Sequence, residues 1–108
     1  NIEIALKACK EATALLLKTE KKDWFTLPAA SFNMMMLLGG TVAGTMLAKS
    51  AVAADAIIKQ NPDVSVFYKN KISTAIFFAE HILPRNIGYL RAIKYGSKSI
   101  MAINAKDF

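Results

Sequence analysis

Apolar residues recur at intervals of three and four positions along most of the chain, the spacing that places them on one face of an α-helix. The first stretch with this spacing, residues 2–21, separates apolar from charged positions, so we predict one amphipathic helix there. Its apolar face consists of Ile2, Ala5, Cys9, Ala12 and Leu16. Charged residues at 20–23 end the pattern.

A second helix is predicted over residues 29–60, just after Pro28, a residue that fits the first turn of a helix. Residues 24–48 carry no charge, and an uncharged run of that length is compatible with a membrane span. Small and polar residues interrupt the run, including Gly40 and Gly44 at the GxxxG spacing. We therefore interpret it as a buried central helix whose small residues let its neighbours approach closely. Membrane insertion is the alternative.

Two more helices are predicted, at residues 64–83 and 85–103. Asn61 or Asp63 is expected to cap the first of them. Pro84 separates the two, because proline cannot continue the hydrogen bonding of a helix. No segment keeps the alternating pattern of a β-strand.

Four helices joined by short links predict an all-α fold, arranged as an antiparallel up-and-down four-helix bundle. The chain of 108 residues has the length of one domain, so we treat residues 1–108 as a single bundle. Hydrophobic residues make up 54% of the chain, which is ample material for a core. Gly96 lies inside the fourth helix, where it is expected to bend or interrupt it.

The third predicted helix has apolar residues on two sides. Most of them form an inner stripe, but Ile76 and Phe77 fall on the far side, near the polar residues Lys69, Ser73 and Glu80. An apolar patch on the outside of a small domain usually marks an interface. We therefore predict that Ile76 and Phe77 are interface residues, exposed in the isolated domain and covered in a larger protein.

The net charge of +6 comes mostly from lysine, because Arg85 and Arg91 are the only arginines among 14 basic residues. Sequence-specific nucleic-acid surfaces usually rely on arginine side chains and on basic runs with interleaved aromatic residues. This sequence has few arginines and no such basic run. The lysines are spread along the chain. We interpret them as solvated surface charges and predict no nucleic-acid partner.

Residues that usually carry out catalysis or bind metals are few and scattered. The single histidine, His81, has no second histidine to share a metal ion, and no Glu-x-x-His pattern occurs. The single cysteine, Cys9, is expected to be a small buried apolar residue. Gly39 and Gly40 are not followed by the lysine of a phosphate-binding loop. We therefore predict no catalytic, cofactor-binding or metal-binding residue in this chain.

The third helix and its exit carry a recognisable motif, Phe67-Tyr68-x-x-Lys71-Ile72-x-x-Ala75-x-Phe77-Phe78-Ala79-Glu80-His81-Ile82-Leu83-Pro84. This motif resembles the C-terminal helical extension found on one branch of the acyl-CoA dehydrogenases. The glycine-rich residues 38–48 and the closing residues 96–108 are similar to other parts of that extension. The chain departs from the extension at Ile76, where arginine is common, and near Met46, where an aromatic residue is common.

The resemblance implies that the chain is the C-terminal part of a larger enzyme, and its start at Asn1 without a signal peptide agrees with this. The parent would contain FAD and oxidise an acyl-CoA to the trans-2-enoyl-CoA, with its catalytic glutamate in a flavoprotein core upstream. This chain would then be an accessory, non-catalytic domain that packs on the core and shapes the contacts of a homo-oligomer. We expect a cytoplasmic location.

Two other functions stay open at this point. The first is a stand-alone helical module for protein interaction or membrane association, which the uncharged residues 24–48 and the basic net charge favour. The second is an enzyme in its own right. Flavin absorbance or acyl-CoA oxidation by the 108 residues alone would support this function. We expect neither flavin absorbance nor acyl-CoA oxidation.

Overall fold

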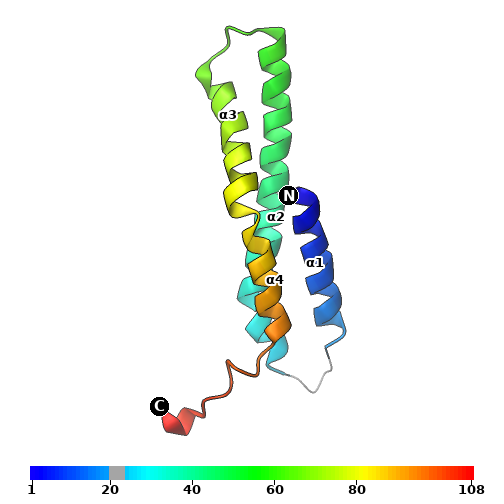
Figure 1. The fold of residues 1–108 in the computed structure, drawn as a ribbon, viewed down its shortest axis with the longest axis vertical. Helices are drawn as coiled ribbons and strands as arrows, with labels where there is room; N and C mark the ends of the chain where they lie inside the picture. The colour runs from blue at the N-terminus through cyan, green and yellow to red at the C-terminus, as the bar shows by residue number, and fades with distance from the viewer. Residues whose placement is uncertain (20–23) are drawn as a thin grey trace.

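The computed structural model describes residues 1–19 and 24–108, and all regular secondary structure in these residues is helical. The predicted all-α fold is therefore confirmed. A π-helix joins the last two α-helices, and a short 3-10 turn lies near the end of the chain (Figure 1). The elements are α1 (Ile2–Leu17), α2 (Thr26–Gln60), α3 (Val66–Phe77), the π-helix η1 (Phe78–Ile82), α4 (Arg85–Tyr95) and the 3-10 turn η2 (Ala105–Asp107).

α3, η1 and α4 form one bent rod rather than two separate helices. The amide of Leu83 donates to the carbonyl of Phe78 at 3.0 Å, and the amide of Asn86 donates to the carbonyl of Leu83 at 3.0 Å. Leu83 and Pro84 themselves have helical φ and ψ angles, so the π-helix lets the chain pass the proline without a break. The four-helix bundle predicted from the sequence is therefore not what the structure shows. The described residues form three rods, the third of them bent.

The first and last predicted helices extend too far. α1 ends at Leu17, and residues 20–23, which were expected to close the first helix, lie outside the described residues. α4 ends at Tyr95 because Gly96 adopts a φ of 70°, a conformation that favours glycine and does not continue a helix. Residues 97–103, predicted as helix, form turns and bends instead.

The starts of the two middle helices also differ from the prediction. α2 begins two residues before Pro28, so this proline lies inside the first turn, where its missing N–H costs no hydrogen bond. At the start of α3 the amide of Phe67 donates to Ser65 Oγ at 3.2 Å. Ser65 is therefore the N-cap of α3, and the prediction that Asn61 or Asp63 caps this helix was wrong.

α2 is the axis of the domain. The bent rod runs antiparallel to α2, with α3 along one half and α4 along the other, and α1 packs beside α2 and α4 (Figure 1). The first residues of α1 lie near the middle of α2, so one half of α2 and all of α3 form a two-helix hairpin. The domain is long and thin, 66 × 30 × 15 Å. Its main apolar cluster lies where the three rods meet and consists of Ala8, Cys9, Ala12, Ala30, Leu37, Leu90 and Ile93.

Although α2 is central, most of its surface is not buried. Of its 35 residues, those that are buried are Ala30, Leu37, Thr41, Gly44 and Ala54. α1 is less than half as long as α2 and cannot cover the rest. The prediction of a buried central helix was therefore wrong. Within the described residues, α2 is the one helix with the length and apolar composition of a membrane span, and 17% of its most apolar window is buried.

A buried polar network ties the three rods together. The Asn86 side chain donates from Nδ2 to Thr41 Oγ1 at 2.8 Å and to the Leu37 carbonyl at 3.3 Å. The Thr41 hydroxyl donates to the same carbonyl at 2.8 Å, and the Cys9 thiol of α1 lies 3.2 Å from Thr41 Oγ1. Asn86 and Thr41 are 2% and 5% exposed. These bonds therefore form away from water, where a polar group left without a partner is costly.

The close approach of the bent rod to α2 depends on Gly44. A Cβ added at Gly44 would lie 3.0 Å from both methyl carbons of Leu83, which is itself buried. One turn earlier, a Cβ added at Gly40 would lie 3.4 Å from Asn86 Oδ1. The GxxxG spacing seen in the sequence thus marks the contact between α2 and the bent rod, as expected of small residues at a close helix contact.

Replacement of Asn86 by aspartate tests the polar network. Asn86→Asp keeps the side-chain shape, removes both N–H donors and places a carboxylate beside the oxygens of Thr41 and Leu37. We expect a loss of about 3 kcal/mol of unfolding free energy at neutral pH, because an unpaired buried charge is costly. Burial would raise the pKa of the new carboxyl group in the folded state. The folded state would then bind more protons, so part of the lost stability should return as the pH falls.

Urea denaturation at several pH values measures both effects. Asn70→Asp is the matched control, because Asn70 is exposed on α3. A loss at position 86 no larger than the loss at position 70 would mean that the network contributes nothing to stability.

Two glycine-to-alanine variants test the close helix contact. A Cβ added at Gly88 in α4 meets nothing within 4 Å, so Gly88→Ala should stabilise the fold by about 0.5–1 kcal/mol through helix propensity. Gly44→Ala has the same intrinsic gain, but its new methyl group meets Leu83, and we expect a net loss of stability. Thermal denaturation compares the two variants. Equal stabilisation at both positions would contradict a tight contact at Gly44.

Candidate functional site

The two predicted interface residues are both exposed. Ile76 retains 52% of its accessible surface and Phe77 retains 54%. The Phe77 ring stacks on the imidazole of His81, one turn later, with ring centroids 5.1 Å apart. His81 is thus an exposed residue packed on an aromatic ring at the surface of the bent rod. The assignment of Ile76 and Phe77 to an interface stays a prediction.

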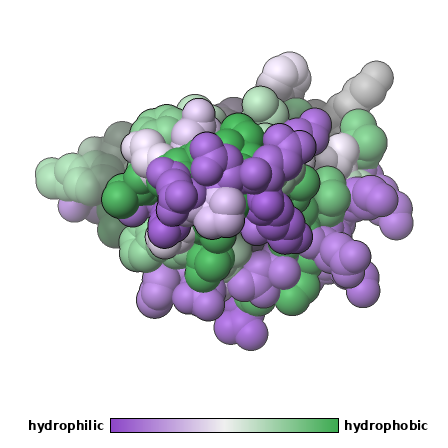
Figure 2. Space-filling model, turned by 90° about the horizontal axis from the view of Figure 1, so that it is seen from above, coloured by the Kyte–Doolittle hydropathy of each residue, from purple (hydrophilic) through white to green (hydrophobic). Residues whose placement is uncertain are grey.

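Ile76 and Phe77 belong to a wider set of exposed apolar side chains. α2 alone contributes several that are more than half exposed: Phe32, Met35, Val42, Met46 and Val52. Viewed from the α2–α3 end of the domain, hydrophobic residues reach the surface on more than one side (Figure 2). Apolar surface of this extent is typical of a domain that packs against another body.

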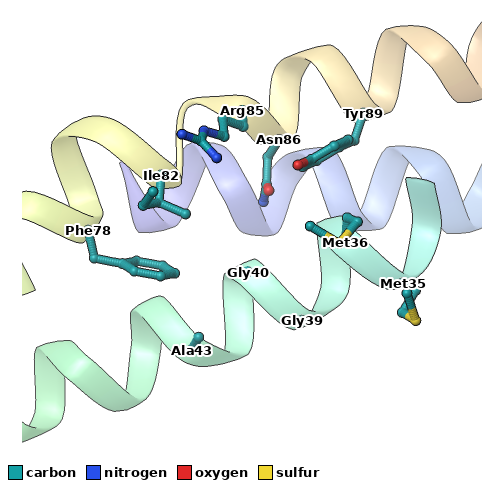
Figure 3. Close-up of a pocket in the computed structure, with 10 residues that line it drawn as sticks. All are labelled: Met35, Met36, Gly39, Gly40, Ala43, Phe78, Ile82, Arg85, Asn86 and Tyr89. Atoms are coloured by element: carbon teal, nitrogen blue, oxygen red, sulfur yellow. The ribbon is translucent and has the colours of Figure 1, made fainter. Parts of the chain in front are cut away.

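A hollow of about 410 Å³ lies between α2 and the bent rod. Phe78, Ile82 and Tyr89 extend from the bent rod toward α2, where Gly39 and Gly40 leave the opposite wall without side chains (Figure 3). The complete lining is Met35, Met36, Gly39, Gly40, Ala43, Phe78, Ile82, Arg85, Asn86 and Tyr89.

The lining of the hollow favours binding over catalysis. It includes no carboxylate, imidazole or thiol, and its one charged group is the Arg85 guanidinium. Asn86 already uses its Nδ2 in the buried network. The Tyr89 phenol is the one further group that could exchange a proton, and no nucleophile lies beside it in the lining. An apolar hollow with a single cation suits an apolar group with an acidic neighbour.

The remaining reactive side chains are placed for structure. Among residues 1–19 and 24–108, no group of three or more His, Cys, Asp or Glu could hold a metal ion. Cys9 is buried, which confirms its predicted role as a small core residue. On the surface of α2 the Lys59 ammonium donates to Asp55, with Nζ and Oδ2 2.9 Å apart, and this contact raises the pKa of Lys59. Lys94 of α4 pairs with Glu11 of α1.

Asn86 and Thr41 were not identified from the sequence. Asn86 stands one turn before Leu90 and two turns before Ile93 on the same face of α4, so it continues a buried apolar stripe with a polar residue. That placement was the available signal. Thr41 gave a weaker signal, because it stands in a glycine-rich segment that could have faced either way.

Comparison with models of protein families matches residues 1–104 to the family described as "Acetyl-CoA dehydrogenase C-terminal like". The match includes the motif of residues 67–84 that carried the resemblance in the sequence. The comparison with curated proteins and the comparison with solved structures each gave no match. Because the family model covers nearly the whole chain, this chain belongs to the family of acetyl-CoA dehydrogenase C-terminal-like domains.

Proposed function

We propose that this chain is a non-catalytic accessory domain of an FAD-dependent acyl-CoA dehydrogenase. In this proposal the domain packs on the flavoprotein core of the same polypeptide and shapes the contacts of a cytoplasmic homo-oligomer. The parent enzyme would oxidise an acyl-CoA to the trans-2-enoyl-CoA. The family match over residues 1–104 carries the proposal, and the uncovered apolar surface of the domain supports it.

Ile76 and Phe77 are the residues we propose for the contact with the core. The side chain of Asn1 donates from Nδ2 to the carbonyl of Ala79 at 2.6 Å, so the start of the chain lies next to this pair. A core that precedes Asn1 would therefore join the domain beside Ile76 and Phe77. If that connection is short, it would favour docking at that surface, because it would raise the effective concentration of the two parts.

The described residues do not fit FAD. Flavin and nicotinamide dinucleotides are usually held through their pyrophosphate by free backbone N–H groups at a glycine-rich turn and helix N-terminus. Gly39 and Gly40 lie inside α2, where the helix itself engages the backbone amides. The hollow beside them offers one guanidinium, from Arg85, in a mostly apolar lining. In the proposal, the flavin, the acyl-CoA and the catalytic base therefore belong to the core.

Side-chain footprinting tests whether a core covers this surface. In the complete enzyme, we expect hydroxyl radicals to oxidise Phe77 several-fold more slowly than in the 108-residue chain, because a buried ring is shielded from the reagent. Tyr95, 82% exposed at the end of α4, serves as the internal reference. Equal oxidation of Phe77 in the two proteins would contradict docking at this surface.

A charge placed at the same surface gives a second measurement. Burial of an isoleucine side chain contributes about 1.5–3 kcal/mol, and Ile76→Glu in the complete enzyme replaces that gain with the cost of burying a charge. We expect the domain to detach, which limited proteolysis would report as faster cleavage between domain and core. Ile103→Glu, exposed beyond α4, is the control and should leave the cleavage rate unchanged.

The absence of catalysis in the domain itself is measurable. The purified 108-residue chain should show no flavin absorbance and no reduction of an electron-accepting dye in the presence of acyl-CoA. Flavin bound in a one-to-one ratio would refute the accessory role, whatever the footprinting shows.

A further inference from the structure

The outer face of α2 carries a regular apolar seam. Starting at Phe32, its positions are spaced by four and three residues in strict alternation as far as Ile57, the heptad spacing of a helix that packs along another helix. Every one of these side chains is exposed, and none is charged. The seam consists of Phe32, Met36, Gly39, Ala43, Met46, Ser50, Ala53 and Ile57.

Parts of the seam border two hollows between α2 and the bent rod. In the lower half of the domain the seam borders the hollow of about 410 Å³, opposite Phe78 and Arg85 of the bent rod (Figure 3). In the upper half it borders a second hollow, of about 210 Å³, opposite Phe67 and Lys71 of α3. Met46 lies between the two hollows and Phe32 before the first, and we call the hollows and the seam together the groove.

We propose that this groove is a self-association surface, in which α2 of a second copy docks antiparallel to α2 of the first. Two helical hairpins joined in this way would give each apolar seam a partner, as in a four-helix arrangement. This inference rests on the proposed function, in which the domain shapes the contacts of a homo-oligomer, and it names the surface that would make such a contact. Its test, however, requires no flavoprotein core.

The residues of the seam are complementary to themselves in the antiparallel register. Across the twofold axis, Met36 of one copy faces Ala53 of the other, and Ala43 faces Met46, so each methionine meets an alanine. Gly39 faces Ser50, which lets the two backbones approach closely. Phe32 and Ile57 close the two ends. Matched large and small residues at facing positions fill an interface without voids or clashes.

The length of the seam also points to α2 as its own partner. The 25 residue-to-residue steps from Phe32 to Ile57 span about 38 Å, and a straight helix of that length is needed to cover them. α2, with 35 residues, is such a helix.

Charge does not oppose the antiparallel arrangement at the seam. Lys49, which borders the seam, would lie level with Gly40 of the other copy. The two Lys49 residues would be about 13 Å apart along the axis, beyond the Debye length of about 8 Å at physiological salt. A parallel arrangement would place them side by side. The net charge of +6 on each copy repels at long range, so added salt should strengthen the association.

Sedimentation equilibrium of the 108-residue chain tests the proposal. We expect a concentration-dependent dimer of the 11.8 kDa chain. Ala43→Lys should weaken the dimer at least about tenfold, because it buries a second cation near Arg85 in a hollow whose lining includes no carboxylate. Val52→Lys is the control, since Val52 is 72% exposed and lies nine residues after Ala43, on the opposite side of the same helix, and it should leave the dimer unchanged. Circular dichroism checks that both variants stay helical.

Cross-linking decides the direction of packing. In a Cys9→Ala background, a chain with Gly39→Cys mixed with a chain with Ser50→Cys should cross-link with a short bismaleimide to form the mixed dimer. Self-cross-linking of the Ser50→Cys chain alone would indicate a parallel pair and overturn the register.

Three other outcomes would overturn the proposal. They are a monomer at every concentration, an Ala43→Lys variant that dimerises as well as the unchanged chain, and partition of the chain into neutral phosphatidylcholine vesicles that Ala43→Lys abolishes. A failed dimer test leaves the footprinting of Phe77 unaffected. The self-association surface and the contact with the core therefore stand or fall separately.

Discussion

The contact of the bent rod with α2 around the carbonyl of Leu37 is the constraint on which the rest of the domain depends. Asn86 and Thr41 both donate to that oxygen, and the thiol of Cys9 brings α1 to the same point. Gly44 makes the contact possible, because any larger residue would meet Leu83. The π-helix between α3 and α4 carries the chain past Pro84, so that Asn86 continues the rod and faces α2.

The residues inside this contact are mostly small, and this explains the amount of apolar surface outside it. The core is built largely from alanine, and Leu37 is the one large side chain among the described residues that is fully buried. Small inner residues bring helices close together but bury little area. The large side chains, such as Phe32 and Met46, are left on the outside. A partner that covered these side chains would add the stabilisation that the small inner residues do not supply.

The two surfaces proposed for such contacts lie on different parts of the molecule. Ile76 and Phe77 lie beside the start of α1, where Asn1 contacts Ala79. The seam of α2, which includes Ala43 and Ala53, borders the two hollows between α2 and the bent rod. Separate surfaces allow the domain to contact a flavoprotein core and a second copy of itself at the same time. This is a reasonable arrangement for an accessory domain that carries no reactive cluster in its described residues.

The sequence by itself determined the helical content and the family, because periodicity and the motif of residues 67–84 are local properties of the chain. It also indicated Cys9 as a core residue and Gly40 with Gly44 as a close helix contact. The number of rods was decided only in three dimensions. A proline predicts a break, yet the π-helix before Pro84 absorbs it without one.

The exposure of α2 was likewise decided by tertiary structure. Hydrophobicity shows that a helix needs partners, but it cannot show how many partners are long enough to cover it. The burial of Asn86 was also decided by tertiary structure. Its amide counts as polar in a sequence pattern, and only the placement of Thr41 and the Leu37 carbonyl beside it makes a buried position favourable.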